Sequence, residues 1–217
     1  VLLDPVDPHT DDEAVADARQ RRLILITMCV SLIAVIASSS GLNVAQQALA
    51  ADIGATQSQL LWIINGYTLA LAALLMPIGA IGDRWGRKPV LVSGLVLFAA
   101  TNLASAFVTS PEPLIALRIV AGIAAAMIMP VTLSVITTSF PAAERAKAIG
   151  TWAGVAGAGG ILGLFASAAI IDNATWPWVF AFPVTVAVIA FVGTLAVVPH
   201  SREHVEAGFD VAGSLLS

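Results

Sequence analysis

The residues best placed for chemistry lie in one charged turn, spelled GAIGDRWGRKPVL over residues 79–91. Asp83 is the only acid of this turn, and it stands among the cations Arg84, Arg87 and Lys88. A carboxylate in this setting can pair with its neighbours or bind the positive N-terminus of another helix. Cations at a membrane edge also fix the orientation of a chain, but orientation alone explains neither the acid nor the glycines. We therefore expect the turn to do more than orient the chain.

The glycines of the turn predict tight backbone geometry. Gly79 and Gly82 are spaced so that two membrane helices can approach closely, as small residues permit. Gly86 can adopt a positive φ angle and end one helix, while Pro89 suits the first turn of the next. The sequence thus predicts a short connection between two antiparallel helices.

A second candidate is Arg118, the only cation inside an apolar segment. A charge within a membrane is costly and marks a functional site by default. Arg118 also lies only a few residues after Pro113, so its side chain could extend to the headgroups at the end of the helix. Both interpretations remain open at this point.

Polar residues in the first apolar segment form a third group of candidates, with Ser38, Asn43 and Gln46 as the main members. They could line a polar cavity, or they could form hydrogen bonds between helices, which is the commoner role. A proton-coupled carrier usually needs a membrane carboxylate, yet no Asp or Glu lies deep in any apolar segment.

The elements that must position these residues are membrane-spanning helices. Of the 217 residues, 58% are hydrophobic and 11% are charged, far fewer charges than a soluble domain carries. No ten-residue segments of alternating polarity suggest a membrane barrel. Apolar runs of helix-spanning length predict an all-α membrane protein with six transmembrane helices. The predicted spans are 22–49, 59–81, 89–110, 113–139, 146–171 and 177–199.

The placement of the cations predicts the orientation of the helices. Under a six-span count, nine of the ten Lys and Arg residues fall on one side. Because cytoplasmic loops are rich in cations, both termini are predicted to be cytoplasmic in a multi-pass protein of the cell membrane. The start of the first span also resembles a signal peptide that would be cleaved before Ala51, but it is longer than such a segment usually is.

Three regions follow from this count: a disordered acidic cytoplasmic tail (1–20), a six-helix bundle (21–199) and a cytoplasmic segment (200–217). The three histidines lie in the two end regions, and the single cysteine, Cys29, lies in an apolar run. No cluster of metal ligands, catalytic nucleophile or phosphate-binding loop is apparent. We expect no enzyme activity, no cofactor, no metal and no nucleic-acid partner. The expected partners are the lipid bilayer and a small-molecule substrate.

The charged turn resembles the motif G-x-L-a-D-r-x-G-r-k-x-x-l of the major facilitator superfamily. Ile81 replaces the Leu, while Gly79, Asp83, Arg84, Gly86, Arg87, Lys88 and Leu91 match. In that family the loop acts as a conformational latch whose Asp engages a helix end in the other half of the transporter. The resemblance implies the N-terminal half of a major facilitator fold.

Other segments are similar to the 14-span drug:proton antiporter branch of that superfamily. Tyr67 lies in a stretch that resembles its second helix, and Arg118 and Gly122 match the fourth-helix pattern, whose Arg is linked to proton coupling. Asn43 matches the first-helix pattern, but Ser38 stands where relatives often have an acid. Arg118, Asn43, Ser38, Gln46 and Tyr67 are therefore candidates for proton coupling or for the substrate cavity.

The fifth span is rich in glycine. Gly150 and Gly154, like Gly159 and Gly163, are four residues apart and predict close helix packing, a role also expected of Gly122. The span matches the antiporter motif of that position poorly, so packing is favoured over a specialised hinge.

The resemblance implies a secondary active transporter, with proton-coupled efflux of drugs or other small organic molecules, present here as a half. Residues 209–216 resemble the run into a seventh helix, so the expected partner is the C-terminal half of the same transporter. The alternative is a truncated, non-transporting membrane protein, either a remnant or a partner subunit.

Overall fold

The computed structural model describes residue 15 and residues 17–198, with the backbone alone at Asp83. The histidines His9, His200 and His204 lie outside the described residues, as do residues 200–217 and most of the predicted tail. The first helix begins at Ala18, so the last three residues of that tail are helical. This early start follows from Asp17, whose side chain accepts a hydrogen bond from the Arg19 amide at 2.8 Å and caps the helix.

The described chain contains helices and no strand, as predicted. The elements are α1 (Ala18–Ile53), α2 (Gln57–Trp85), α3 (Arg87–Ser105), α4 (Pro111–Ser139), α5 (Ala142–Asn173), the 3₁₀ helix η2 (Trp176–Phe180) and α6 (Ala181–Val197). Each predicted span coincides with one helix, with ends displaced by a few residues. The sixth differs most, because its first turn is the 3₁₀ helix η2, which contains a proline near its start.

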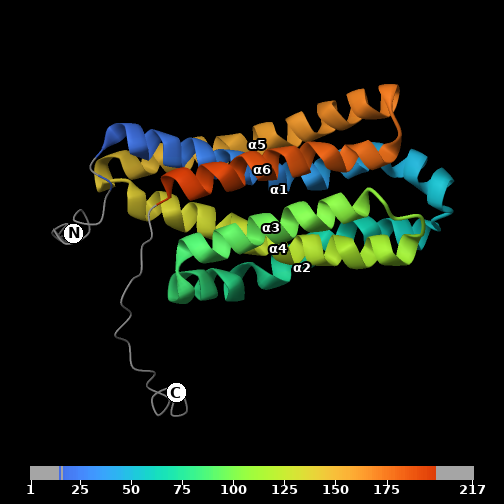
Figure 1. Cartoon of the computed structure of the whole chain (residues 1–217), viewed down its shortest axis with the longest axis horizontal. Coiled ribbons are helices and arrows are strands. Elements are labelled where there is room, and N and C mark those ends of the chain that lie inside the picture. The colour runs from blue at the N-terminus through green and yellow to red at the C-terminus, as the bar shows by residue number, and fades with distance from the viewer. Residues whose placement is uncertain (1–14, 16, 199–217) are drawn as a thin grey trace, which may run out of the picture.

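Glycines and caps set the connections between the helices. Gly54 ends α1 with a φ of 65°, and Thr56 and Gln59 form a reciprocal capping box at the start of α2. Gly86 has a φ of 98° and separates α2 from α3, which confirms the predicted positive φ. These short connections keep consecutive helices antiparallel, as Figure 1 shows.

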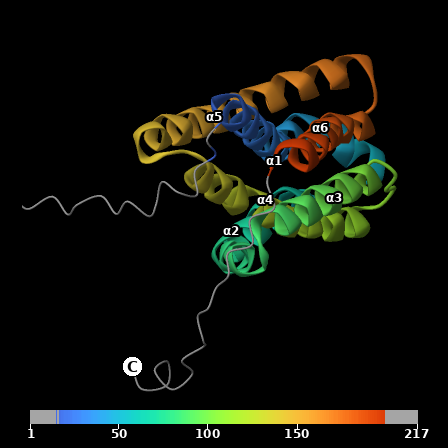
Figure 2. The same ribbon diagram turned by 60° about the vertical axis from the view of Figure 1, so that its left-hand side comes forward.

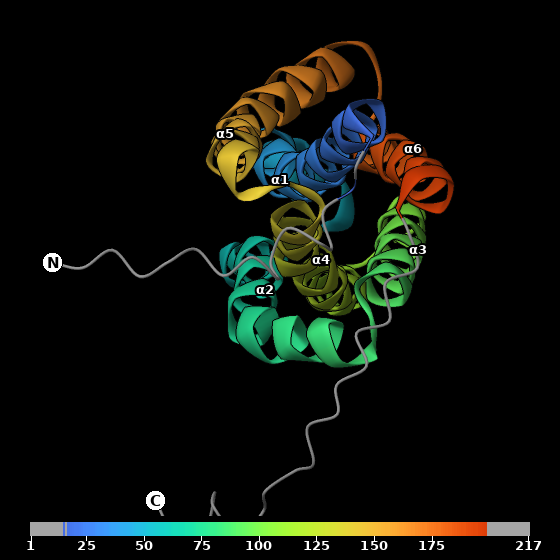
Figure 3. The same cartoon turned by 90° about the vertical axis from the view of Figure 1, so that its left-hand side faces the viewer.

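The helices form two layers of three. Seen from one end, α5, α1 and α6 lie on one side and α2, α4 and α3 on the other (Figure 3). The central helices carry most of the packing, since α1 contacts α5 and α6 while α4 contacts α2 and α3. The turned view in Figure 2 shows the same grouping. The contacts of the first three helices are thus repeated by the last three, which is the pattern of an internal structural repeat.

All six predicted spans meet the length and hydropathy that crossing a bilayer requires, so the chain is a multi-pass membrane protein. The start of α1, the α2–α3 turn and the α4–α5 connection lie at the same end of the bundle (Figure 1). The cation-rich turns therefore share one end, as the orientation prediction requires. Which side of a membrane this end faces stays a prediction.

Candidate functional site

The candidate site centres on Arg118, which α4 carries into the middle of the bundle. Its side chain is only 1% exposed. Nε donates a hydrogen bond to the Ile63 carbonyl oxygen of α2 at 3.3 Å, and Nη1 donates to the Ser38 Oγ of α1 at 3.0 Å. Arg118 therefore does not extend to the headgroups, and the interpretation of a headgroup-seeking side chain is wrong. It turns inward because acceptors are within reach there.

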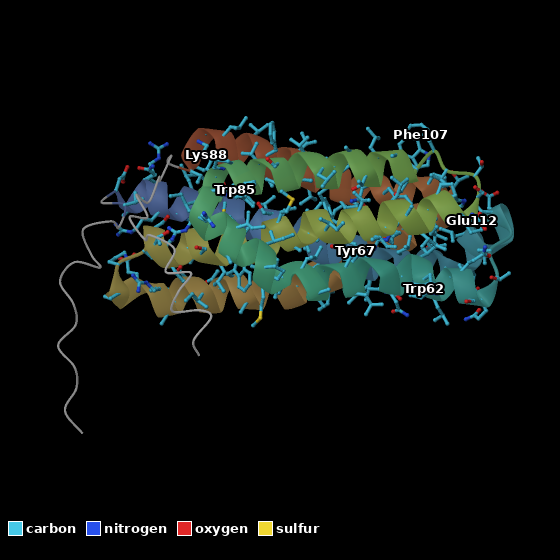
Figure 4. All side chains as sticks on the ribbon, turned by 90° about the horizontal axis from the view of Figure 1, so that it is seen from below. Trp62, Tyr67, Trp85, Lys88, Phe107 and Glu112 are labelled. Atoms are coloured by element: carbon cyan, nitrogen blue, oxygen red, sulfur yellow. The ribbon has the colours of Figure 1, made fainter. Side chains whose placement is uncertain are left out.

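Tyr67 provides one face of the site. The Arg118 guanidinium carbon lies 4.2 Å from the centre of the Tyr67 ring, a cation–π contact. The Tyr67 hydroxyl donates to the Val35 carbonyl oxygen at 2.9 Å, so the ring is held against α1. Figure 4 shows Tyr67 between the two ends of the bundle, far from the terminal residues Lys88 and Glu112. The ring thus packs against the guanidinium within the membrane-spanning part.

Asn102 of α3 completes the site, and sequence reasoning did not single it out. The Ser38 hydroxyl donates to Asn102 Oδ1 at 2.9 Å, while Asn102 Nδ2 donates to the Phe98 carbonyl at 2.8 Å. The Ser38 oxygen is thereby oriented to accept from Arg118. The only signal in the sequence was an Asn within an apolar span, where polar side chains often join helices. The site links α1, α2, α3 and α4, and we call these four side chains, Arg118, Ser38, Tyr67 and Asn102, the arginine cluster.

The arginine cluster contains a cation without a carboxylate. In the described chain the acids of the spans lie close to helix ends, where Asp52 accepts from Trp176 Nε1 at 2.6 Å and Glu112 from Gln59 Nε2 at 2.8 Å. Arg118 is therefore balanced by neutral oxygens and an aromatic face. Burying a charge on such terms is costly, so Arg118 is the leading candidate for a functional residue among the described helices.

Asn43 and Gln46 lie apart from the arginine cluster. Asn43 is exposed and donates to the Ser39 carbonyl at 3.1 Å, and Gln46 donates to Asn43 Oδ1 at 3.1 Å. They occupy another face of α1 from Ser38. The structure thus brings together three of the five predicted cavity residues and leaves these two outside.

The glycines of the charged turn let α2 approach α4. A Cβ on Gly82 would meet Val131 Cγ2 at 2.9 Å, and one on Gly79 would meet Pro130 Cβ at 3.5 Å. Lys88 is buried, and its Nζ donates to the Leu195 and Val198 carbonyls at 3.2 and 2.6 Å. The turn is thereby fixed to the end of α6, and its ammonium group satisfies carbonyls that the helix leaves without a partner.

Three of the five glycines predicted to mediate helix packing do so. A Cβ on Gly122 would clash with the Tyr67 carbonyl, one on Gly163 with the Ser40 hydroxyl, and one on Gly159 would touch Ile33 Cα at 3.4 Å. For Gly150 and Gly154 the prediction of close helix packing is wrong within the described chain, because nothing lies within 4 Å of a Cβ built there. Both glycines are exposed on α5.

Comparisons with known proteins agree on one family. The model of the Major Facilitator Superfamily matches residues 27–216. The methyl viologen resistance protein SmvA of Salmonella typhimurium is 35% identical over 82% of this chain and 36% of its own length. The multidrug efflux pump LfrA of Mycolicibacterium smegmatis is 35% identical over 90% of this chain and 38% of its own. The tetracenomycin C resistance and export protein of Streptomyces glaucescens is 31% identical over 88% of this chain and 36% of its own length.

The fold has solved counterparts. The inward-open xylose transporter XylE from E. coli superposes with a TM-score of 0.67 at 17% identity, covering 82% of this chain and 48% of that one. At this identity the likeness concerns the fold alone. The curated relatives are longer, and the chain spans between 31% and 44% of their length.

Proposed function

Because the chain belongs to the major facilitator superfamily, we propose that it forms six helices of a proton-coupled exporter of drugs or other small organic molecules. The family is one of transporters, and several relatives are named for efflux or for resistance to organic compounds. The observation that carries the mechanism is the arginine cluster. A buried cation at the junction of four helices can respond to charge in a cavity beside it.

Arg118 acts in this proposal as a fixed positive charge. A carboxylate that approaches it is favoured in its ionised form, and a cationic or protonated group is disfavoured. Since the acids of the described helices lie near helix ends, the proton-carrying carboxylate comes from outside α1 to α6. Proton release would then accompany the approach of that carboxylate to the arginine cluster, and substrate binding would reverse it.

A second six-helix unit is the proposed source of that carboxylate and of the other wall of the substrate cavity. Transporters of this architecture bind substrate between two repeats that move against each other. Half or more of the most apolar part of α1, α3 and α4 is buried, whereas most of the corresponding part of α2 and α5 is uncovered. These two helices thus offer apolar surface, and α5 offers the open Gly150 and Gly154 positions, for a further helix bundle.

The charged turn serves as the latch between the two units. Gly82 packs the end of α2 against α4, and the Lys88 ammonium group bonds to carbonyls at the end of α6, so the turn is anchored on both sides. From this anchored turn Asp83 would engage a helix end of the second unit in one conformation and release it in another. We place this end of the bundle in the cytoplasm and the protein in the plasma membrane, in keeping with the distribution of the cations.

The test is transport in everted membrane vesicles that contain the protein expressed from its complete reading frame. We expect ethidium and methyl viologen to accumulate in these vesicles when a proton gradient is imposed, and the accumulation to collapse with a protonophore. Vesicles without the protein are the control. Absence of any gradient-driven accumulation across a panel of organic cations, anions and neutral dyes would reject the proposal.

The alternative is a membrane protein that does not transport and acts as a partner subunit. The observation that favours it is Ser38, which stands where relatives often have an acid. Under this alternative, vesicles would show no accumulation, yet the six-helix chain would co-purify with a second membrane protein. Restoring an acid by Ser38→Asp would then leave transport at the background level.

A further inference from the structure

A basic pocket opens at the cation-rich end of the bundle, where α1 and α5 begin beside the end of α4. Its volume is about 400 Å³. Arg22 of α1 and Lys147 of α5 are exposed at its rim, while Phe140 and Ala148 line its buried part. Figure 3 views the bundle from this end, with the first turns of α1 and α5 toward the viewer. The pocket is separate from the arginine cluster.

The charges of the pocket leave a net positive rim. Arg21 pairs with Glu144 at 3.2 Å and donates to the Val15 carbonyl at 2.7 Å, so these two charges offset each other. In the described part of the chain neither Arg22 nor Lys147 forms an ion pair. The N-terminus of α5 lies at the same pocket and adds partial positive charge, whereas the N-terminus of α1 is capped by the Asp17 carboxylate. The rim is therefore suited to an anion.

The lining below the rim is apolar. Leu25 lies about two turns into α1, and Phe140 and Ala148 are 6% and 3% exposed. From Glu144 to Thr151 the α5 wall runs about 10 Å along the helix, at 1.5 Å per residue. A cationic rim above an apolar wall matches an amphiphile at the membrane surface. A free phosphate would contact only the rim and leave the apolar wall unused. The ammonium group of a choline headgroup would be repelled by Arg22 and Lys147.

We propose that this pocket binds an anionic phospholipid, with the phosphate at Arg22 and Lys147 and the upper part of an acyl chain against Leu25 and Phe140. Basic pockets between helices on the cytoplasmic side are suited to such headgroups. The inference rests on the proposed orientation, in which this end faces the anionic leaflet. It does not rest on transport activity.

Native mass spectrometry of the purified chain in neutral detergent tests the pocket, with phosphatidylglycerol, phosphatidylcholine and inorganic phosphate as probes. We expect phosphatidylglycerol to bind tightly. Arg22→Gln and Lys147→Gln should each weaken it about fivefold, and the double variant more than twentyfold. Arg19→Gln is the matched control, because Arg19 is exposed in the same turn of α1 and does not line the pocket. It should change binding less than twofold.

Three results would overturn the proposal: equal binding of the two lipids, full displacement by millimolar phosphate, or equal losses in Arg19→Gln and Arg22→Gln. The conservative variant Arg22→Lys with Lys147→Arg keeps both charges and should retain binding within about threefold. Loss of binding in that variant, with helical ellipticity unchanged, would likewise reject a charge-based headgroup site. These readouts are independent of transport, so failure of the exporter proposal would leave them interpretable.

Discussion

Replacing Arg118 by methionine should abolish transport while leaving the fold nearly as stable as before. Methionine keeps an unbranched side chain, shorter than that of arginine, and removes the charge. The change deletes two hydrogen bonds, to the Ile63 carbonyl and to Ser38, together with the cation–π contact with Tyr67. Any functional loss could then be attributed to the missing charge.

The expected stability follows from two opposing effects. Side-chain hydrogen bonds in membrane proteins contribute about 0.6 kcal/mol each, and a cation–π contact about 1 kcal/mol. Losing all three contacts therefore costs about 2 kcal/mol. A cation at the middle of a membrane helix costs about 2.5–3.5 kcal/mol, and because Arg118 lies about two turns into α4 the substitution relieves at most this amount. The two effects nearly cancel, so the free energy of unfolding should change by about 1 kcal/mol or less.

The assay pairs two measurements on the protein expressed from its complete reading frame. Unfolding in mixed micelles, followed by helical ellipticity, reports stability, and dye accumulation in everted vesicles reports transport. Arg118→Lys is the control variant, since it keeps the charge but loses the planar fork and should retain part of the activity. A loss of more than about 3 kcal/mol in Arg118→Met would show that Arg118 is structural. Normal transport by that variant would refute its role as a fixed charge.

Three further predictions concern packing and orientation. Gly122→Ala should lower the free energy of unfolding by about 1–3 kcal/mol because its Cβ would meet the Tyr67 carbonyl, whereas Gly154→Ala should change it by less than about 0.5 kcal/mol in the six-helix chain. Lys88→Met should cost about 1–2 kcal/mol and speed hydrogen exchange in the last turn of α6, because two carbonyls lose their donor; unchanged exchange there would contradict this. Asn102→Leu should lower transport several-fold with little change in expression, because Ser38 loses the acceptor that orients it. Transport at the wild-type level in this variant would contradict the orienting role of Asn102.

The fold could be predicted from the sequence because the bilayer imposes a simple rule. A helix that crosses the bilayer must be apolar over its full crossing length, and six segments of this chain meet that requirement. Helix ends were less predictable, since local caps decide them. α1 ends at Ile53 because Gly54 adopts a left-handed conformation with a φ of 65°. It begins at Ala18 because the Asp17 side chain caps it.

The candidate site could be predicted only in part, because the sequence identifies residues but does not determine how each helix is rotated. Arg118 stood out as a cation within an apolar span, but two directions were possible for its side chain. In the structure the Arg118 side chain points inward, and helix packing explains this direction. Gly122 brings α4 against the Tyr67 carbonyl, which places Arg118 beside the Tyr67 ring. Asn102 was missed because its importance comes from a hydrogen bond to Ser38, a residue 64 positions away.

The arginine cluster also shows the role of Ser38 at the position where the family resemblance implies an acid. An acid at position 38 would lie against Arg118 as an ion pair within one bundle. Ser38 instead accepts one hydrogen bond from Arg118 and donates one to Asn102, so the charge of Arg118 stays uncompensated by any acid of the described helices. An uncompensated charge acts over a longer distance than a paired one in a medium of low dielectric constant. In the proposed mechanism the counterion of Arg118 therefore comes from outside these six helices, where movement of a second unit would bring it close or take it away.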